Sequence, residues 1–109
     1  MDSLQNIFEM QKSLTEMMDL SRYPSSVEAR ISNLATAIVH ETVELQRLTS
    51  WKWWKKPVPF DENSAREEII DIWHFVVQAS IELGMGPSDI VDHYKKKNDI
   101  NKMRQSSGY

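Results

Sequence analysis

The sequence predicts an all-α fold: a bundle of four to five helices that associates with further copies of itself. Apolar residues recur at helical spacing in four segments, and no segment alternates apolar and polar residues as a half-buried strand would. Short connections that contain proline or glycine separate these segments, as in bundles of antiparallel helices. Together these observations predict one helical domain over residues 1–109.

The composition excludes several classes of protein. Apolar residues make up 40% of the chain and charged residues 27%, as in an ordinary globular domain. The net charge of −3 gives no general attraction to nucleic-acid polymers or to anionic membranes. The chain has no cysteine, so a metal would need oxygen or nitrogen ligands. No apolar run approaches the roughly 20 residues that span a bilayer, and no signal peptide is recognisable, so we expect a cytoplasmic protein.

The first half of the chain supplies two of the expected helices. Leucine, isoleucine, phenylalanine and methionine recur at helical spacing over residues 3–20, which predicts an amphipathic helix. Pro24 follows and disfavours helix at the residue before it. Ser25 or Ser26 then caps a second helix, whose apolar stripe continues to residue 48 and includes the charged Glu41.

A connector over residues 51–60 separates the second helix from the third. Its two prolines end the helical pattern, and the third helix is expected to begin within 61–64 and to end at Leu83. From Ile69 onward this helix is apolar on nearly every side, as helices buried among other helices are. The partner helices of one chain cover such a surface poorly, so we expect a homodimer or homotetramer.

Four acidic residues form two i, i+3 pairs inside apolar helical segments: Glu41 with Glu44, and Glu68 with Asp71. Carboxylates drawn toward one interior repel each other and resist desolvation, and a hard divalent cation such as Mg²⁺ or Mn²⁺ resolves that conflict. The alternative is a set of solvated acids, with Glu41 paired to an arginine. A ferritin-like di-iron site would need two Glu-x-x-His motifs, and Arg47 occupies the position of the second histidine.

The connector is unusually rich in tryptophan and lysine. Trp53 and Lys55 offer an aromatic face for a base and a cation for phosphate. The same residues could equally form a packed connector or an aromatic lid over the end of the bundle. A membrane-surface role is disfavoured, because the prolines prevent an extended amphipathic helix.

The last helix is expected to begin at Pro87 and to run to Gln105, before a loose tail over 106–109. One interpretation of its polar second half is a solvated helix whose cations favour the helix dipole. The other is a phosphate-binding face, since lysine, asparagine and arginine stand at i, i+4 and i+7 with a further asparagine beside them. The residues of this face are Lys97, Asn98, Asn101 and Arg104.

The order of these motifs resembles a known family. Glu41-x-x-Glu44 followed by Glu68-x-x-Asp71 is similar to the motif of the all-α nucleotide pyrophosphohydrolases, the MazG and dimeric dUTPase superfamily. The tryptophan–lysine connector and the run Asp71-Ile72-Trp73-His74-Phe75 resemble the dimeric dUTPase branch more closely, as does the ending from Lys97 to Tyr109. The chain is shorter than typical dimeric dUTPases.

The resemblance implies the following site. The four acids would ligate Mg²⁺, with Glu41 or Glu44 orienting the attacking water. Lys97, Asn101, Arg104 and Tyr109 would hold phosphates, with Asn98 beside them, and Trp53 and Lys55 would contact the nucleotide. In the first helix Gln11 matches a base-recognising glutamine, while Thr15 stands where an asparagine is usual.

The expected function is Mg²⁺-dependent hydrolysis of a deoxynucleoside triphosphate, with dUTP converted to dUMP and pyrophosphate. One alternative is a MazG-like hydrolase of another or of mixed deoxynucleoside triphosphates. A second alternative is a non-catalytic helical oligomer that binds nucleotide or metal.

Overall fold

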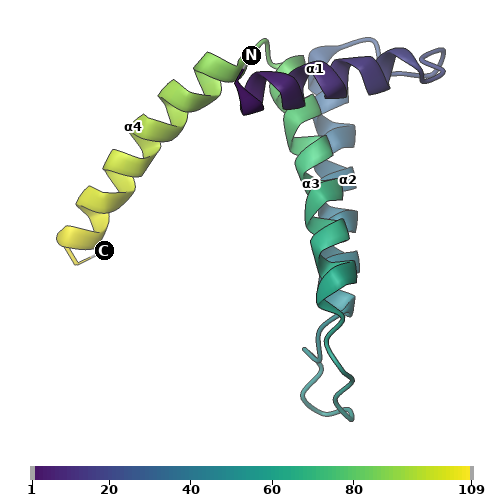
Figure 1. The fold of residues 1–109 in the computed structure, drawn as a ribbon, viewed down its shortest axis with the longest axis vertical. Coiled ribbons are helices and arrows are strands. Elements are labelled where there is room, and N and C mark those ends of the chain that lie inside the picture. The colour runs from purple at the N-terminus through teal and green to yellow at the C-terminus, as the bar shows by residue number, and fades with distance from the viewer. Residues whose placement is uncertain (1, 109) are drawn as a thin grey trace.

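The computed structural model describes residues 2–108 and is helical between its connections, which confirms the predicted all-α class (Figure 1). The helices in this range are α1 (Ser3–Glu16), α2 (Val27–Arg47), α3 (Glu62–Glu82) and α4 (Pro87–Ser106). No strand occurs among the described residues. None of the helices in residues 2–108 combines the length and the apolar character needed to cross a bilayer.

The later helices begin where the sequence indicated. Ser26 caps α2, its Oγ accepting a backbone hydrogen bond at 3.1 Å. Asp61 caps α3 in the same way, again at 3.1 Å. Pro87 is the first residue of α4, as expected. Local cap chemistry therefore decides these three boundaries.

The C-terminal end of the chain differs slightly from the expectation. α4 continues through Ser106, so the expected tail of 106–109 begins one residue later. Tyr109, a predicted phosphate contact, lies outside the described residues.

The first helix is shorter than expected, because α1 ends at Glu16 and not at residue 20. Met17 follows as its C-cap, and Asp19 Oδ1 then accepts a hydrogen bond from Ser21 N at 2.9 Å. Such a side-chain bond offers the backbone an alternative to the helix. Met17 is 84% exposed, so packing against a neighbouring helix does not stabilise further turns of α1.

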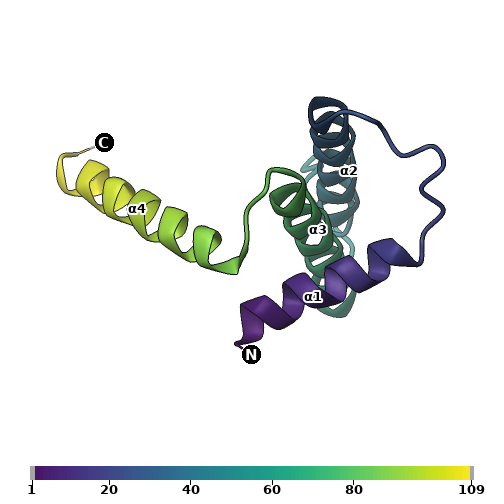
Figure 2. The same cartoon turned by 90° about the horizontal axis from the view of Figure 1, so that it is seen from above.

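α2 and α3 run antiparallel side by side, and α1 crosses α3 near one end of this pair (Figure 1). Figure 2 shows that α4 leads away from the other helices; among the described helices it contacts α1. The buried apolar core is small and consists of Phe8, Leu34, Ala65 and Val77. Phe8, Leu34 and Val77 lie toward the end of the helix pair that α1 crosses, whereas Ala65 lies in the first turn of α3 near the connector.

The expected burial of α3 on all sides is not found within one chain. Val77 is 4% exposed, but Ile70 and Trp73 are each 53% exposed. α3 meets α2 on one side and α1 near its end, and these contacts leave the rest of its apolar surface open. Apolar side chains all round a helix require more neighbours than this chain provides.

Candidate active site

A cavity of about 880 Å³ lies between α1, α2 and α3. It exists because α1 packs on α3 and crosses it, which leaves a hollow on the side toward α2. Glu41 and Asp71 line one part of its wall, and Gln11 and Gln78 line another. The cavity therefore joins two different kinds of polar surface, carboxylates and amides.

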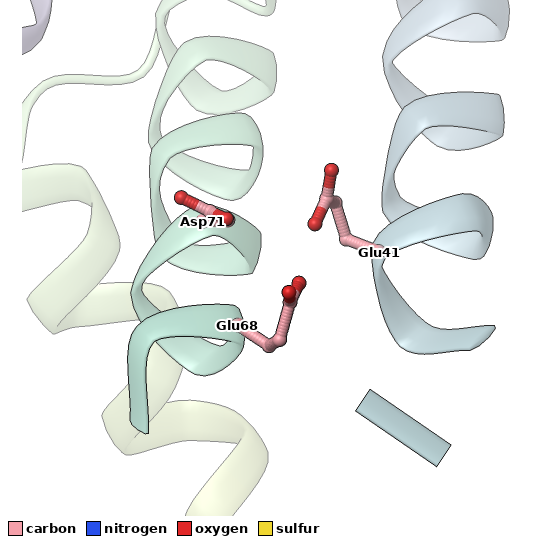
Figure 3. Close-up of side chains that lie close together, drawn as sticks. All are labelled: Glu41, Glu68 and Asp71. Atoms are coloured by element: carbon pink, nitrogen blue, oxygen red, sulfur yellow. The ribbon is translucent and has the colours of Figure 1, made fainter. Parts of the chain in front are cut away.

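Three of the four predicted metal ligands come together at the carboxylate wall. Glu41 on α2 faces Glu68 and Asp71 on α3 across the helix pair, and Figure 3 shows the three side chains converging. One carboxylate oxygen from each residue lies within 4.8 Å of the others. The i, i+3 spacing places Glu68 and Asp71 on one side of α3, and the antiparallel packing of α2 brings Glu41 opposite them.

The electrostatics of this acidic cluster are unfavourable without a counter-charge. The pKa of Glu68 is raised, first by a hydrogen bond shared with the carboxyl of Glu41, then by burial and by the negative charges of Glu41, Asp71 and Glu44. Among the described residues, no group donates a hydrogen bond to the buried Glu68 Oε2. An all-oxygen donor set with an unpartnered buried oxygen fits a hard cation such as Mg²⁺ or Mn²⁺.

Glu44, the fourth predicted ligand, does not join the cluster. Its carboxylate is exposed and lies 3.7 Å from Nη1 of Arg47 on the outside of α2. Glu44 has the same i, i+3 spacing to Glu41 as Asp71 has to Glu68, but its side chain pairs with Arg47 on α2 and not with the acids of α3. Its charge still acts on Glu68, where it contributes to the raised pKa.

The amide wall contains one residue that the sequence indicated and one that it did not. Gln11 is 7% exposed, and its Nε2 donates to Gln78 Oε1 at 3.1 Å. Thr15 Oγ donates to the same oxygen at 2.9 Å. Gln78 was not anticipated as a site residue. The available signal was a polar amide within the apolar run Val76-Val77-Gln78-Ala79.

The predicted nucleotide contacts on the connector do not line this cavity. Trp53 is 87% exposed in the connector between α2 and α3, which lies at the end of the helix pair opposite α1 (Figure 1). It forms an edge-to-face contact with Trp54, whose ring centroid is 5.8 Å away. Lys55 is exposed in the same connector.

The predicted phosphate-binding face of α4 is likewise separate from the acidic cluster. α4 points away from the α2–α3 pair (Figure 2). Its four described candidates, Lys97, Asn98, Asn101 and Arg104, are all exposed. Within one chain, the structure brings together acids and amides but not the basic face.

Comparison with known proteins decides the family. Residues 3–88 match the family described as dUTPase. The chain belongs to this family, the dUTPase-like branch of the all-α nucleoside triphosphate pyrophosphohydrolases. The matched range includes the acidic cluster and both amides of the cavity wall. The resemblance inferred from the sequence motifs is thereby confirmed.

Two curated relatives are phage proteins. The dCTP pyrophosphatase of Enterobacteria phage T4 is 34% identical over 71 residues, which cover 54% of the chain and 42% of the relative. The dCTP pyrophosphatase of Enterobacteria phage LZ5 is 30% identical over an alignment 121 residues long with its gaps, which covers 84% of the chain and 70% of the relative. The chain thus spans less than half the length of the T4 relative. No solved structure matches it.

Proposed function

We propose that this protein is a Mg²⁺-dependent pyrophosphohydrolase of a pyrimidine deoxynucleoside triphosphate. One water is consumed, one phosphoric anhydride bond breaks, and the products are the monophosphate and pyrophosphate. The observation that carries this proposal is a single cavity with clustered carboxylates on one wall and buried amides on another. Family membership supports it, and so do the two relatives named dCTP pyrophosphatase. dUTP and dCTP are therefore the leading candidate substrates.

In this proposal Glu41, Glu68 and Asp71 hold Mg²⁺, or Mn²⁺ in its place. The cation, when bound, makes water more acidic and neutralises charge on the departing pyrophosphate. The three carboxylates also require it, because the anionic triphosphate cannot approach an uncompensated acidic cluster. Glu41 belongs both to the cluster and to the cavity wall, so it is better placed than Glu44 to orient the attacking water.

We also propose that the site is completed in a homo-oligomer. A second copy would cover the apolar groove of about 380 Å³ that Ile7, Met10 and Trp73 line between α1 and α3. The outstretched α4 of one copy would then reach the phosphates bound by another. The residues it would deliver are Lys97, Asn98, Asn101 and Arg104. Light scattering coupled to size exclusion tests this point: Trp73→Glu should lower the molar mass to that of one chain, and a monomeric wild type would contradict it.

The deciding experiment is pyrophosphate release from dUTP, dCTP, dTTP, dATP and dGTP, each with Mg²⁺ and with chelator. We expect Mg²⁺-dependent release that is fastest from dUTP or dCTP. Release without base preference would keep the reaction and favour the MazG-like alternative. Absence of release from all five would contradict the proposed activity and favour a non-catalytic nucleotide- or metal-binding oligomer.

A further inference from the structure

A series of hydrogen bonds, here named the amide relay, links Arg30, Tyr23, Glu82 and Gln78 to Gln11 in the amide wall of the cavity. Arg30 Nη1 donates to Glu82 Oε2 at 3.2 Å, and Tyr23 Oη donates to Glu82 Oε1 at 2.7 Å. Gln78 Nε2 donates to the same Oε1 at 2.9 Å. Gln11 Nε2 then donates to Gln78 Oε1 at 3.1 Å. Gln11 and Gln78 line the cavity, whereas Glu82 does not.

The charge of Glu82 fixes which groups donate and which accept along the amide relay. An ionised carboxylate only accepts hydrogen bonds, so the amide of Gln78 must turn its nitrogen toward Glu82. The oxygen of Gln78 then faces Gln11 and can only accept, so Gln11 must turn its own nitrogen toward Gln78. Thr15 Oγ lies 2.9 Å from the same oxygen and 3.0 Å from the backbone oxygen of Gln11, so its single proton is compatible with this orientation but does not impose it.

Glu82 is held in its ionised form. Burial raises its pKa, but hydrogen bonds from Tyr23, Gln78 and Arg30, together with the charge of Arg30, outweigh burial and lower the pKa. Burial and the neighbouring carboxylate of Glu82 raise the pKa of Tyr23, which keeps its hydroxyl a donor. The Arg30 guanidinium also lies 4.6 Å from the centroid of the Tyr23 ring, which holds the two donors together.

The last acceptor of the amide relay, Gln11 Oε1, has no donor among the described residues. Gln11 is 7% exposed and forms part of the cavity wall, and none of the described residues donates to its buried Oε1. A buried acceptor without a partner costs about 1–3 kcal/mol, so a ligand that brings an N–H to it gains binding energy. A pyrimidine base carries such donors on its pairing edge, the N4 amino group of cytosine or the N3–H of uracil.

We infer that Glu82, acting through Gln78, is a positioning residue that fixes the amide of Gln11 with its oxygen toward the nucleobase, so that base selectivity depends on a carboxylate remote from the nucleotide. The inference rests on the proposed function. A reversed Gln11 amide would present N–H groups and would favour a base edge with acceptors at the same place. Discrimination between cytosine and uracil therefore requires that the amide not reverse.

The test is Glu82→Gln, which keeps the size of the side chain and removes its charge. A neutral amide can donate or accept, so Gln78 and Gln11 can adopt both orientations. We expect the ratio of kcat/KM between the preferred and the disfavoured pyrimidine triphosphate to fall by about tenfold toward one, as loss of one fixed hydrogen bond predicts. The value of kcat on the preferred substrate should change far less, because the acidic cluster is untouched.

Matched variants separate positioning from general damage. Glu62→Gln removes a surface ion pair of the same length, 3.2 Å to Arg66 on the same helix, and should leave the ratio unchanged. Glu82→Asp keeps an acceptor-only carboxylate and should retain most of the preference even if the protein is less stable. Gln78→Met removes the relay itself and should lower the ratio as Glu82→Gln does.

The outcomes are distinguishable from a failure of the proposed function. Absence of triphosphate hydrolysis in the wild type would contradict the function itself. Hydrolysis by the wild type without preference between dUTP and dCTP would overturn the inference alone. So would an unchanged ratio in folded Glu82→Gln, with folding checked by circular dichroism. If Glu82→Gln does not fold, the ratio in Gln78→Met decides: an unchanged ratio overturns the inference and a reduced one supports it.

Discussion

The acidic cluster and the amide relay lie beside the same cavity, but they differ in whether their polar atoms find hydrogen-bond partners within the protein. In the relay, donors and acceptors alternate from Arg30 to Gln11, and the buried Oε1 of Gln11 has no donor among the residues that the structure describes. In the cluster, three acceptor-only carboxylates face one another, and described residues donate nothing to the buried Glu68 oxygen. The relay is hydrogen-bonded from end to end except at Gln11 Oε1, and it suits a rigid recognition surface. The cluster is incomplete and suits the binding of a cation.

The largest effect is expected from Asp71→Asn, which removes one of the three carboxylates of the acidic cluster. It should lower kcat/KM at least about 100-fold, since a metal supplies several kcal/mol of charge stabilisation and each 1.4 kcal/mol is tenfold. The thermal midpoint without Mg²⁺ should not fall, because one of three repelling charges is gone. Mg²⁺ should no longer raise that midpoint. Turnover close to that of the wild type would exclude Asp71 as a ligand, and Glu62→Gln is the unaffected control.

Arg30→Met removes the ion pair between Arg30 and Glu82 in the amide relay, and we expect it to lower the free energy of unfolding. It leaves the Glu82 side chain, 10% exposed, without its cation but with two neutral donors. We expect a loss of about 2 kcal/mol, below the value for a fully buried pair because Arg30 is partly solvated. Urea unfolding measures it. Arg66→Met, which breaks the exposed pair with Glu62, should cost at most about 0.5 kcal/mol. Equal losses would mean that the relay is not a structural element.

Trp53→Ala asks whether base recognition is confined to the cavity. Stacking of a base on an aromatic ring contributes about 1–3 kcal/mol, so removal of the ring should raise KM roughly tenfold. The value of kcat should change less, if stacking serves the ground and transition states alike. Steady-state kinetics on the preferred substrate decides. An unchanged KM would leave the amide wall as the base-binding surface and give the connector no part in it.

The smallest expected effect is on the pH dependence of the free energy of unfolding, to which the two regions should contribute with opposite sign. A carboxyl whose pKa is raised on folding stabilises the protein below its unfolded pKa, and this contribution is lost as pH rises through the folded value. For Glu68 the loss therefore occurs above its ordinary value of 4.5. Glu82, whose pKa is lowered, stabilises the protein above 4.5 and loses that contribution only at lower pH.

The measurement is urea unfolding of the metal-free protein from neutral pH down to about pH 5, in the wild type and in Glu68→Gln. The wild type should gain stability over this range relative to the variant. Saturating Mg²⁺ should abolish the difference, because the cation replaces the proton as the counter-charge of the cluster. If the free energy of unfolding depends on pH in the same way in the metal-free wild type and in Glu68→Gln, the neighbouring acids do not raise the pKa of Glu68.

Much of the architecture could be predicted because it depends on local chemistry. The caps at Ser26 and Asp61 and the proline that begins α4 act within a few residues, and the observed boundaries agree with them. The end of α1 could not be predicted in this way. Its apolar pattern continues past Glu16, but the helix stops because the chain offers no further surface for those side chains.

Residue type and i, i+3 spacing in the sequence are sufficient to predict the helical fold and the oxygen-rich character of the site, and the resemblance of its ordered motifs indicated the family. Which acids meet depends on how the helices pack. The packing of α2 on α3 directs Glu41 to Glu68 and Asp71 and leaves Glu44 with Arg47. Helix packing also decided the amide relay, because Gln11 and Gln78 are 67 residues apart in the chain. The contact between them exists only because α1 crosses α3, and no local signal reports a crossing.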